Sequence, residues 1–167
     1  MQLNFTTDAE DFQRAARSWL ALNVPRTRAP CEGTAARDYA VAWLSRCHRA
    51  GWSGIGWLQE HGGRGLPPEK TVLWYEEYVR ARAPSVLDCT FVSLNHAGPT
   101  LIACGTDTQK AIHLPRILSG DAIWCQGFSE PGSGSDLGSL TTRGAIDGEH
   151  LVADQTSAAR TDRRASG

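Results

Sequence analysis

The first 50 residues show a helical apolar period in two segments separated by a polar break. The apolar residues of the first segment share one helical face: Phe12, Ala16, Trp19 and Leu20. Pro25 ends that pattern, and residues 26–34 have the composition of a loop. The second segment, from about residue 35 to 50, has its own stripe: Tyr39, Trp43, Leu44 and Cys47. The pattern therefore predicts two amphipathic helices, the first of them capped by Thr7 and the second ending before Gly51.

A long connection and a third helix follow. Residues 51–66 contain six glycines, and we expect Trp52, Ile55 and Trp57 to anchor this connection against the helices. Pro67 and Pro68 fit the first turn of a helix that reaches about Arg82. We expect three of its side chains to face inward: Val72, Tyr75 and Val79.

The remaining helical segments precede residue 120. Residues 91–104 are apolar on most sides, which predicts a buried helix in which His96 is a hydrogen-bonded core histidine. Pro99 should kink that helix or mark its start. Thr106 and Gln109 form a capping-box pattern at the start of another helix, which ends near Gly120.

The period then changes to that of strands. Residues 122–128 (AIWCQGF) and 140–146 read as strands, and Asp147-Gly148 predicts a hairpin whose second strand begins at 150–152. Residues 153–167 are polar apart from four alanines, which predicts a disordered tail. The predicted fold class is mainly α with a partial β region, organised as a helical domain (1–120), an incomplete β domain (121–152) and the tail (153–167).

Composition excludes several functions. The 167 residues carry a formal charge of -1, which argues against a strongly basic nucleic-acid surface and leaves a local basic patch open. Five widely spaced cysteines, with no C-x-x-C pair, favour free thiols over a disulfide framework or a metal site. No stretch has the length of a membrane span or the pattern of a signal peptide, so we expect a cytoplasmic protein.

Candidate chemistry gathers in the loop 129–136, SEPGSGSD. Small hydroxyls and glycines directly after a predicted strand can form an anion-binding nest, and an aromatic such as Phe128 can pack against a flat ring. A well-hydrated hairpin loop is the alternative interpretation. We expect Glu130 to be a structural carboxylate that accepts backbone N–H bonds. Glu76 and Glu77, on a helix with Arg80, predict a solvated, ion-paired face rather than an acid/base pair.

The order of these motifs resembles the acyl-CoA dehydrogenase family. The segments GTDTQKAIHLPRILSG (105–120) and WCQGFSEPGSGSD (124–136) carry the resemblance, which extends from about residue 5 to 152. It implies a helical N-terminal domain followed by the first strands of a middle β domain. It also implies FAD as cofactor and α,β-dehydrogenation of an acyl-CoA thioester to a trans-2-enoyl-CoA in lipid metabolism. An electron-transfer flavoprotein would accept the electrons, and the family is usually homo-oligomeric.

The resemblance assigns roles to individual residues of the loop. It implies cofactor binding by five of them: Gln126, Phe128, Ser129, Gly134 and Ser135. Ser135 would also contact the substrate, and the helices before Gly120 would form one wall of the acyl pocket. No residue of this chain matches the family's catalytic carboxylate, so we expect no catalytic residue here.

The chain departs from the family pattern near residue 153. The family continues with a G-Q-K-x-W-T/S strand and later a C-terminal helical domain, whereas this chain reads ADQTSAARTDRRASG. We therefore expect an incomplete fragment, ended by a frameshift or premature stop, that is inactive alone and binds FAD weakly or not at all. The alternative is a non-catalytic interaction module that pairs with a full-length relative or a separate C-terminal chain. A third interpretation is an unrelated anion-binding helical protein.

Overall fold

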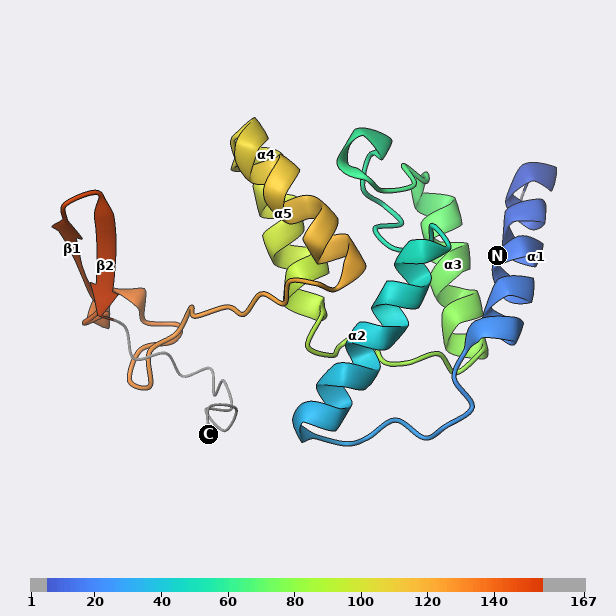
Figure 1. Ribbon diagram of the computed structural model, residues 1–167, viewed down its shortest axis with the longest axis horizontal. Helices are drawn as coiled ribbons and strands as arrows, with labels where there is room; N and C mark the ends of the chain where they lie inside the picture. Colours follow the sequence, from blue (N-terminus) through green and yellow to red (C-terminus); the bar gives the residue numbers. More distant parts are fainter. Residues whose placement is uncertain (1–5, 155–167) are drawn as a thin grey trace. The chain divides into compact units, whose positions relative to one another are not determined.

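The computed structural model describes residues 6–154, which divide into a helical unit up to Trp124 and a second unit from Cys125 (Figure 1). The mainly α fold with a small β region is as predicted. The predicted tail began at residue 153, but residues 153 and 154 belong to a β-strand, so the prediction is wrong for these two residues. From residue 155 on, the tail lies outside the described residues. No helix within the described residues combines the length and the apolarity that crossing a membrane requires.

The first two helices form where their apolar stripes predict them. Helix α1 spans Thr7–Asn23, and its N-cap is Thr6, whose hydroxyl accepts a hydrogen bond from the Ala9 amide at 3.2 Å. The predicted cap at Thr7 is therefore wrong by one residue. Helix α2 spans Gly33–Arg49 and is followed by Gly51 at φ +72°, a conformation that favours glycine.

Helix α3, Pro68–Arg80, begins with a proline as predicted but buries the opposite face. Its inward side chains are Leu73, Trp74, Glu77 and Tyr78. The three side chains that were expected inside are 55%, 43% and 75% exposed: Val72, Tyr75 and Val79. The prediction failed because α3 has apolar residues on two faces, and α1 packs against the face that contains Trp74 and Glu77.

An aromatic cluster forms the core of the helical unit. Trp52, from the glycine-rich connection, stacks on Trp74 with ring centroids 4.6 Å apart and planes at 9°. The Trp43 indole donates to the Tyr78 hydroxyl at 2.6 Å, and that hydroxyl donates to the Pro84 carbonyl at 2.7 Å. Both polar atoms of these buried rings are thus satisfied. The predicted anchoring role of Trp52 is confirmed.

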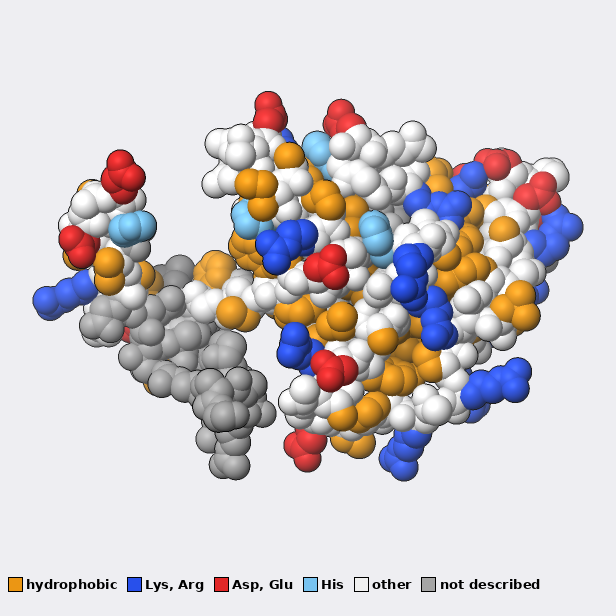
Figure 2. Space-filling model, viewed as in Figure 1, with side chains coloured by type: hydrophobic (Ala, Val, Ile, Leu, Met, Phe, Trp, Pro, Cys, Tyr) orange, Lys and Arg blue, Asp and Glu red, His pale blue; other side chains and the backbone are white. Residues whose placement is uncertain are grey.

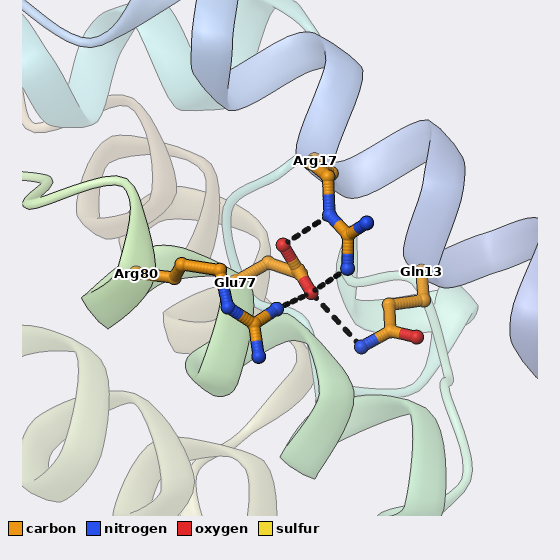
Figure 3. A network of polar contacts seen from close by, with 4 residues as sticks. All are labelled: Gln13, Arg17, Glu77 and Arg80. Carbon is orange, nitrogen blue, oxygen red and sulfur yellow. Dashed lines mark hydrogen bonds and ion pairs between the residues drawn. The ribbon is translucent and has the colours of Figure 1, made fainter.

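A buried carboxylate joins α1 to α3 (Figure 3). Glu77 is 1% exposed and accepts two hydrogen bonds from Arg17 at 2.8 Å and one from Gln13 at 2.9 Å. Arg80 pairs with the same carboxylate. The predicted ion pairing is confirmed, but the expected solvent exposure of Glu77 is wrong, because α1 covers this side of α3.

The stretch 91–104 is less buried than expected. It forms a π-helical turn η2, Ser93–Ala97, and helix α4, Gly98–Cys104, with Pro99 in the first turn of α4. Only Ser93 and Gly98 are buried in η2 and α4. His96 is exposed and its ring meets the edge of Phe91, so the prediction of a core histidine is wrong.

Helix α5, Asp107–Ser119, completes the helical unit. It starts with the predicted capping box, in which Thr106 and Gln109 each bond the other's backbone amide. It ends at Gly120, whose φ is +85°. The short 3-10 turn η1, Gln59–His61, lies in the connection before α3 and contacts α5.

The second unit contains one antiparallel hairpin. Strand β1, Arg143–Asp147, pairs with β2, His150–Asp154, and Ile146 lies opposite Leu151. The predicted hairpin is confirmed, although its two loop residues are Gly148 and Glu149. Gly148 has φ +60°, which suits the first position of a two-residue hairpin loop. The prediction of a strand at 122–128 is wrong: within the described residues the sheet contains β1 and β2, and this segment has no regular secondary structure.

Candidate functional site

The loop 129–136 is built around a tight turn. The backbones of Glu130 and Ser133 exchange two hydrogen bonds, of 3.0 and 3.1 Å, across Pro131 and Gly132. Proline suits the second position of such a turn because its φ is already fixed near the required value. Ser129 directly precedes the hydrogen-bonded pair Glu130 and Ser133, and Gly134 directly follows it.

Glu130 fixes this turn to the residues that precede β1. Its carboxylate is 7% exposed and accepts from the Thr141 amide at 2.9 Å, from the Thr141 hydroxyl at 2.8 Å, and from the amide and hydroxyl of Thr142. The hydrogen bond from the Thr142 hydroxyl and that from the Thr141 amide lower the pKa of Glu130 to about 2. The prediction of a structural carboxylate is confirmed.

The second half of the loop is closed by serine side chains. Asp136 presents its carbonyl oxygen to the hydroxyls of Ser133 and Ser139, the latter at 3.0 Å. The chain then makes a 3-10 turn η3, Leu137–Ser139. A Cβ added at Gly132 or Gly134 would meet no atom within 4 Å. The backbone at both glycines is therefore open to the approach of a ligand.

The five residues assigned to cofactor binding all lie in the second unit, on this turn and the extended segment before it. Phe128 is 65% exposed, which leaves its ring available for stacking on a flat group. Gln126 and Ser129 are half-buried, whereas Gly134 and Ser135 are exposed. The site thus combines an aromatic face, hydroxyl groups and an open glycine backbone, which suit a flat ring and phosphate groups.

Sequence reasoning missed the two threonines that hold the loop. Thr141 and Thr142 are eleven and twelve residues from Glu130, and nothing in a polar Thr-Thr pair before a strand signals a carboxylate partner. The contacts of Thr141 and Thr142 also argue against Glu130 as a general base. A carboxylate that accepts from two amides and two hydroxyls, with a pKa of about 2, binds a proton too weakly for that role. The described residues contain no group of three side chains that could hold a metal ion.

The helical unit has a separate hollow of about 470 Å³ between α2, α3 and the segment that leads into η2. Its walls are aromatic at six positions: Trp43, Trp52, Trp57, Trp74, Tyr75 and Tyr78. Buried side-chain polar atoms in the described part of the chain all have hydrogen-bond partners. Polar side chains also line the hollow: Ser53, Thr71, Ser85, Asp88, Thr90 and Asn95. A ligand there would meet aromatic faces and polar groups together.

Comparison with known proteins relates the chain to a family. Residues 6–121 match the family described as "Acyl-CoA dehydrogenase, N-terminal domain". The chain is 43% identical over 152 residues to the acyl-CoA dehydrogenase IpdE1 of Mycobacterium tuberculosis, which covers 87% of this chain and 39% of that protein.

Two solved structures show the same fold over most of the chain. The Tcur3481-Tcur3483 steroid ACAD matches with a TM-score of 0.73 at 34% identity, over 96% of this chain and 42% of the other. A glutaryl-CoA dehydrogenase from Mycobacterium smegmatis, in complex with FADH2, matches with a TM-score of 0.65 at 22% identity, over 90% and 38% of the two chains. The chain spans about two fifths of the length of these relatives. The match to the family over residues 6–121, together with 43% identity to IpdE1, shows that this chain belongs to the acyl-CoA dehydrogenase family.

Proposed function

We propose that the protein contributes the helical domain and the flavin-contacting loop of an FAD-dependent acyl-CoA dehydrogenase. The reaction is the α,β-dehydrogenation of an acyl-CoA thioester to the trans-2-enoyl-CoA. The observation that carries the proposal is the Glu130-anchored turn, which leaves Phe128 exposed and the backbone at Gly134 open. Bound FAD would supply the acceptor for the hydride that leaves the β-carbon.

Each loop residue then has a task that its surroundings allow. The Phe128 ring would pack against the flavin ring system, and Ser129 and Gln126 would donate hydrogen bonds to the flavin. Gly134 and Ser135 would hold the cofactor phosphates, because the open backbone at Gly134 allows a close approach. Ser135 would also contact the acyl-CoA.

We place the general base outside the described residues, so residues 6–154 alone do not turn over substrate. Glu130 is the buried carboxylate of the loop. It accepts hydrogen bonds from the two threonines, which keep it ionised and engage its oxygens. The other buried carboxylate, Glu77, is paired with two arginines in the helical unit. Their hydrogen bonds and ion pairs hold the pKa of each carboxyl near 2, so neither is suited to take a proton from a thioester.

The helical unit contributes a wall of the acyl pocket in this proposal. The steroid ACAD likeness, at 34% identity, favours an acyl group that carries fused rings, and the aromatic hollow of about 470 Å³ suits apolar ring surfaces. The electrons would pass to an electron-transfer flavoprotein. The relative described as the ChsE4-ChsE5 complex of Mycobacterium tuberculosis, 32% identical, favours assembly with other dehydrogenase chains.

The test is to titrate FAD into the isotope-labelled chain and follow backbone amide signals by NMR, a method that detects binding even at millimolar dissociation constants. We expect shifts confined to residues 126–135, and a loss of binding of about tenfold in Phe128→Ala. Leu140→Ala is the matched control, because Leu140 is an exposed apolar residue of the same unit at 42% exposure. Shifts spread over the helical unit, or no shift at millimolar FAD, would refute the assignment of the loop.

A further inference from the structure

Three arginines line a hollow of about 370 Å³ between α1 and α3, here called the arginine hollow. Arg17 comes from α1, Arg80 from α3, and Arg26 from the loop after α1. Glu77 is the one carboxylate among the described residues that line it. The lining therefore carries a net of two positive charges, which attract an anion. Figure 2 shows Lys and Arg side chains over the helical unit, with hydrophobic side chains exposed between them.

Glu77 holds two of these guanidinium groups in place. Its carboxylate accepts hydrogen bonds from Nε and Nη2 of Arg17, both at 2.8 Å, and pairs with Nη1 of Arg80. A bidentate contact fixes the plane of a guanidinium as well as its position. The two arginines are thus oriented before a ligand arrives, which lowers the entropy that binding costs.

Both arginines keep N–H groups that Glu77 does not use. A guanidinium has more donors than these contacts occupy, and Figure 3 shows nitrogen atoms of both side chains without a contact to the residues drawn. The side chains of Arg17 and Arg80 are 56% and 57% exposed, so a ligand can reach them from solvent. Arg26 is exposed, and within residues 6–154 its side chain has no hydrogen bond or ion pair. Donors on three side chains therefore remain for a ligand.

The ends of α1 and α3 do not cancel this positive charge. Helix C-termini carry partial negative charge on their last carbonyl oxygens, and both helices end beside the hollow. The Asn23 carbonyl already accepts from the Arg46 guanidinium at 2.7 Å, and the Glu77 carbonyl accepts from the Ala81 amide at 2.9 Å. Arg46 also adds a further positive charge at the end of α1.

We propose that the arginine hollow binds a phosphate group with two negative charges, which is either free phosphate or the phosphate of an ester. Such a dianion matches the net charge of the lining, and its oxygens fit the planar fork of donors on a guanidinium. Glu77 is 1% exposed, so the ligand meets the arginines rather than the carboxylate. The rest of the lining is apolar and suits the organic part of an ester: Leu20, Ala21, Val24 and Ala81.

Titration of inorganic phosphate into the isotope-labelled 167-residue chain tests the site. The Nε–H signals of the arginines are followed by NMR at about pH 8, where phosphate is mostly doubly charged, with sodium chloride keeping the ionic strength constant. We expect shifts of the Arg17 and Arg80 signals with a dissociation constant on the order of 1 mM, and binding of singly charged acetate at least about fivefold weaker. No shift at about 50 mM phosphate, or acetate that binds as well as phosphate, would overturn the proposal.

Replacing Arg26 by Gln tests the contribution of the third arginine. Arg26 lies outside the hydrogen bonds of Glu77, so the contact between α1 and α3 stays intact, and we expect phosphate to bind at least about threefold more weakly. Arg28→Gln is the matched control, because it removes the same charge from an exposed position of the same loop that does not line the hollow. Equal weakening in the two variants would show attraction to overall charge alone and would contradict a defined site.

Phenyl phosphate in the same titration distinguishes the two sources of the phosphate group. Tighter binding than inorganic phosphate would identify an ester whose apolar part lies on Val24 and its apolar neighbours. Weaker binding would identify free phosphate as the ligand. Neither probe contains a flavin, so a failure here leaves the proposed FAD loop untouched.

Discussion

Replacing Glu77 by Gln should weaken the contact between α1 and α3. The carboxylate is 1% exposed and accepts hydrogen bonds from Arg17 at 2.8 Å and Gln13 at 2.9 Å, and it also pairs with Arg80. The hydrogen bonds from Arg17, together with those from Arg80, lower the pKa of Glu77 from 4.5 to about 2 against the opposing effect of burial. The amide of the variant keeps the shape but loses the charge that both arginines bind.

The pKa difference sets the size of the effect and its dependence on pH. A difference of about 2.5 between the folded and unfolded pKa corresponds to at most about 3 kcal/mol at neutral pH. The two arginine side chains are 56% and 57% exposed, so water screens them and we expect about 2 kcal/mol. Because the folded pKa is the lower one, this stabilisation is complete above pH 4.5 and is lost as the pH falls toward 2. More than half of it should be gone by about pH 3.

Urea unfolding followed by tryptophan fluorescence measures this directly, since all six tryptophans lie in the helical unit. The difference between wild type and Glu77→Gln should be about 2 kcal/mol at pH 7 and should shrink at pH 3. The matched control is Glu76→Gln, the exposed neighbour, which should change stability by less than about 0.5 kcal/mol. Equal losses in both variants, or a difference that is the same at pH 7 and pH 3, would refute the charge argument.

Three further predictions concern other parts of the chain. Gly98→Ala should lower the free energy of unfolding in urea by about 1–3 kcal/mol, because its Cβ would lie 2.1 Å from the Trp57 ring. The control is Gly56→Ala, whose Cβ would meet no atom within 4 Å, and it should lower the free energy of unfolding by less than about 1 kcal/mol. Cys47, whose pKa burial raises to about 12, should resist a thiol reagent until the chain unfolds, while the four exposed cysteines react; five fast thiols would contradict this. Glu130→Gln should speed hydrogen exchange of the two threonine amides that bond its carboxylate by at least about tenfold at neutral pH. In the wild type, the protection of these amides should weaken below pH 4.5, because the folded pKa of Glu130 is about 2. Unchanged exchange in the variant would contradict the anchoring role of Glu130.

Some helix ends could be predicted because local chemistry determines them. The capping box of Thr106 and Gln109 needs only residues three apart, and the positive φ at Gly51 and Gly120 follows directly from the loss of the helical pattern at those points. The hairpin was found for the same reason, since Gly148 sits between two short runs of strand-like residues. Each of these signals lies within a few residues of the feature it predicts.

The choice of buried face could not be predicted in the same way. Helix α3 has apolar residues on two sides, and periodicity alone does not distinguish Leu73 and Trp74 from Val72 and Val79. The decision depends on Arg17, which is 60 residues away and requires Glu77 to face α1. The failed strand at 122–128 has a similar cause, because a strand needs a partner and the Trp124 amide instead donates to the Ser93 hydroxyl at 2.8 Å.

The candidate site combines features that the local sequence predicts with features that depend on distant contacts. Its composition indicated a ligand-binding loop, but the shape of the loop comes from the hydrogen bonds between Glu130 and two distant threonines. The strands beside it supply little hydrophobic support, since every residue of β1 is exposed and Ile146 is 84% exposed. An uncovered hairpin is marginal in water, so polar contacts must hold the loop in its binding shape. Under the proposed function, the affinity for FAD should follow the integrity of the Glu130 contacts, because a loop that must first become ordered binds more weakly by the cost of ordering it.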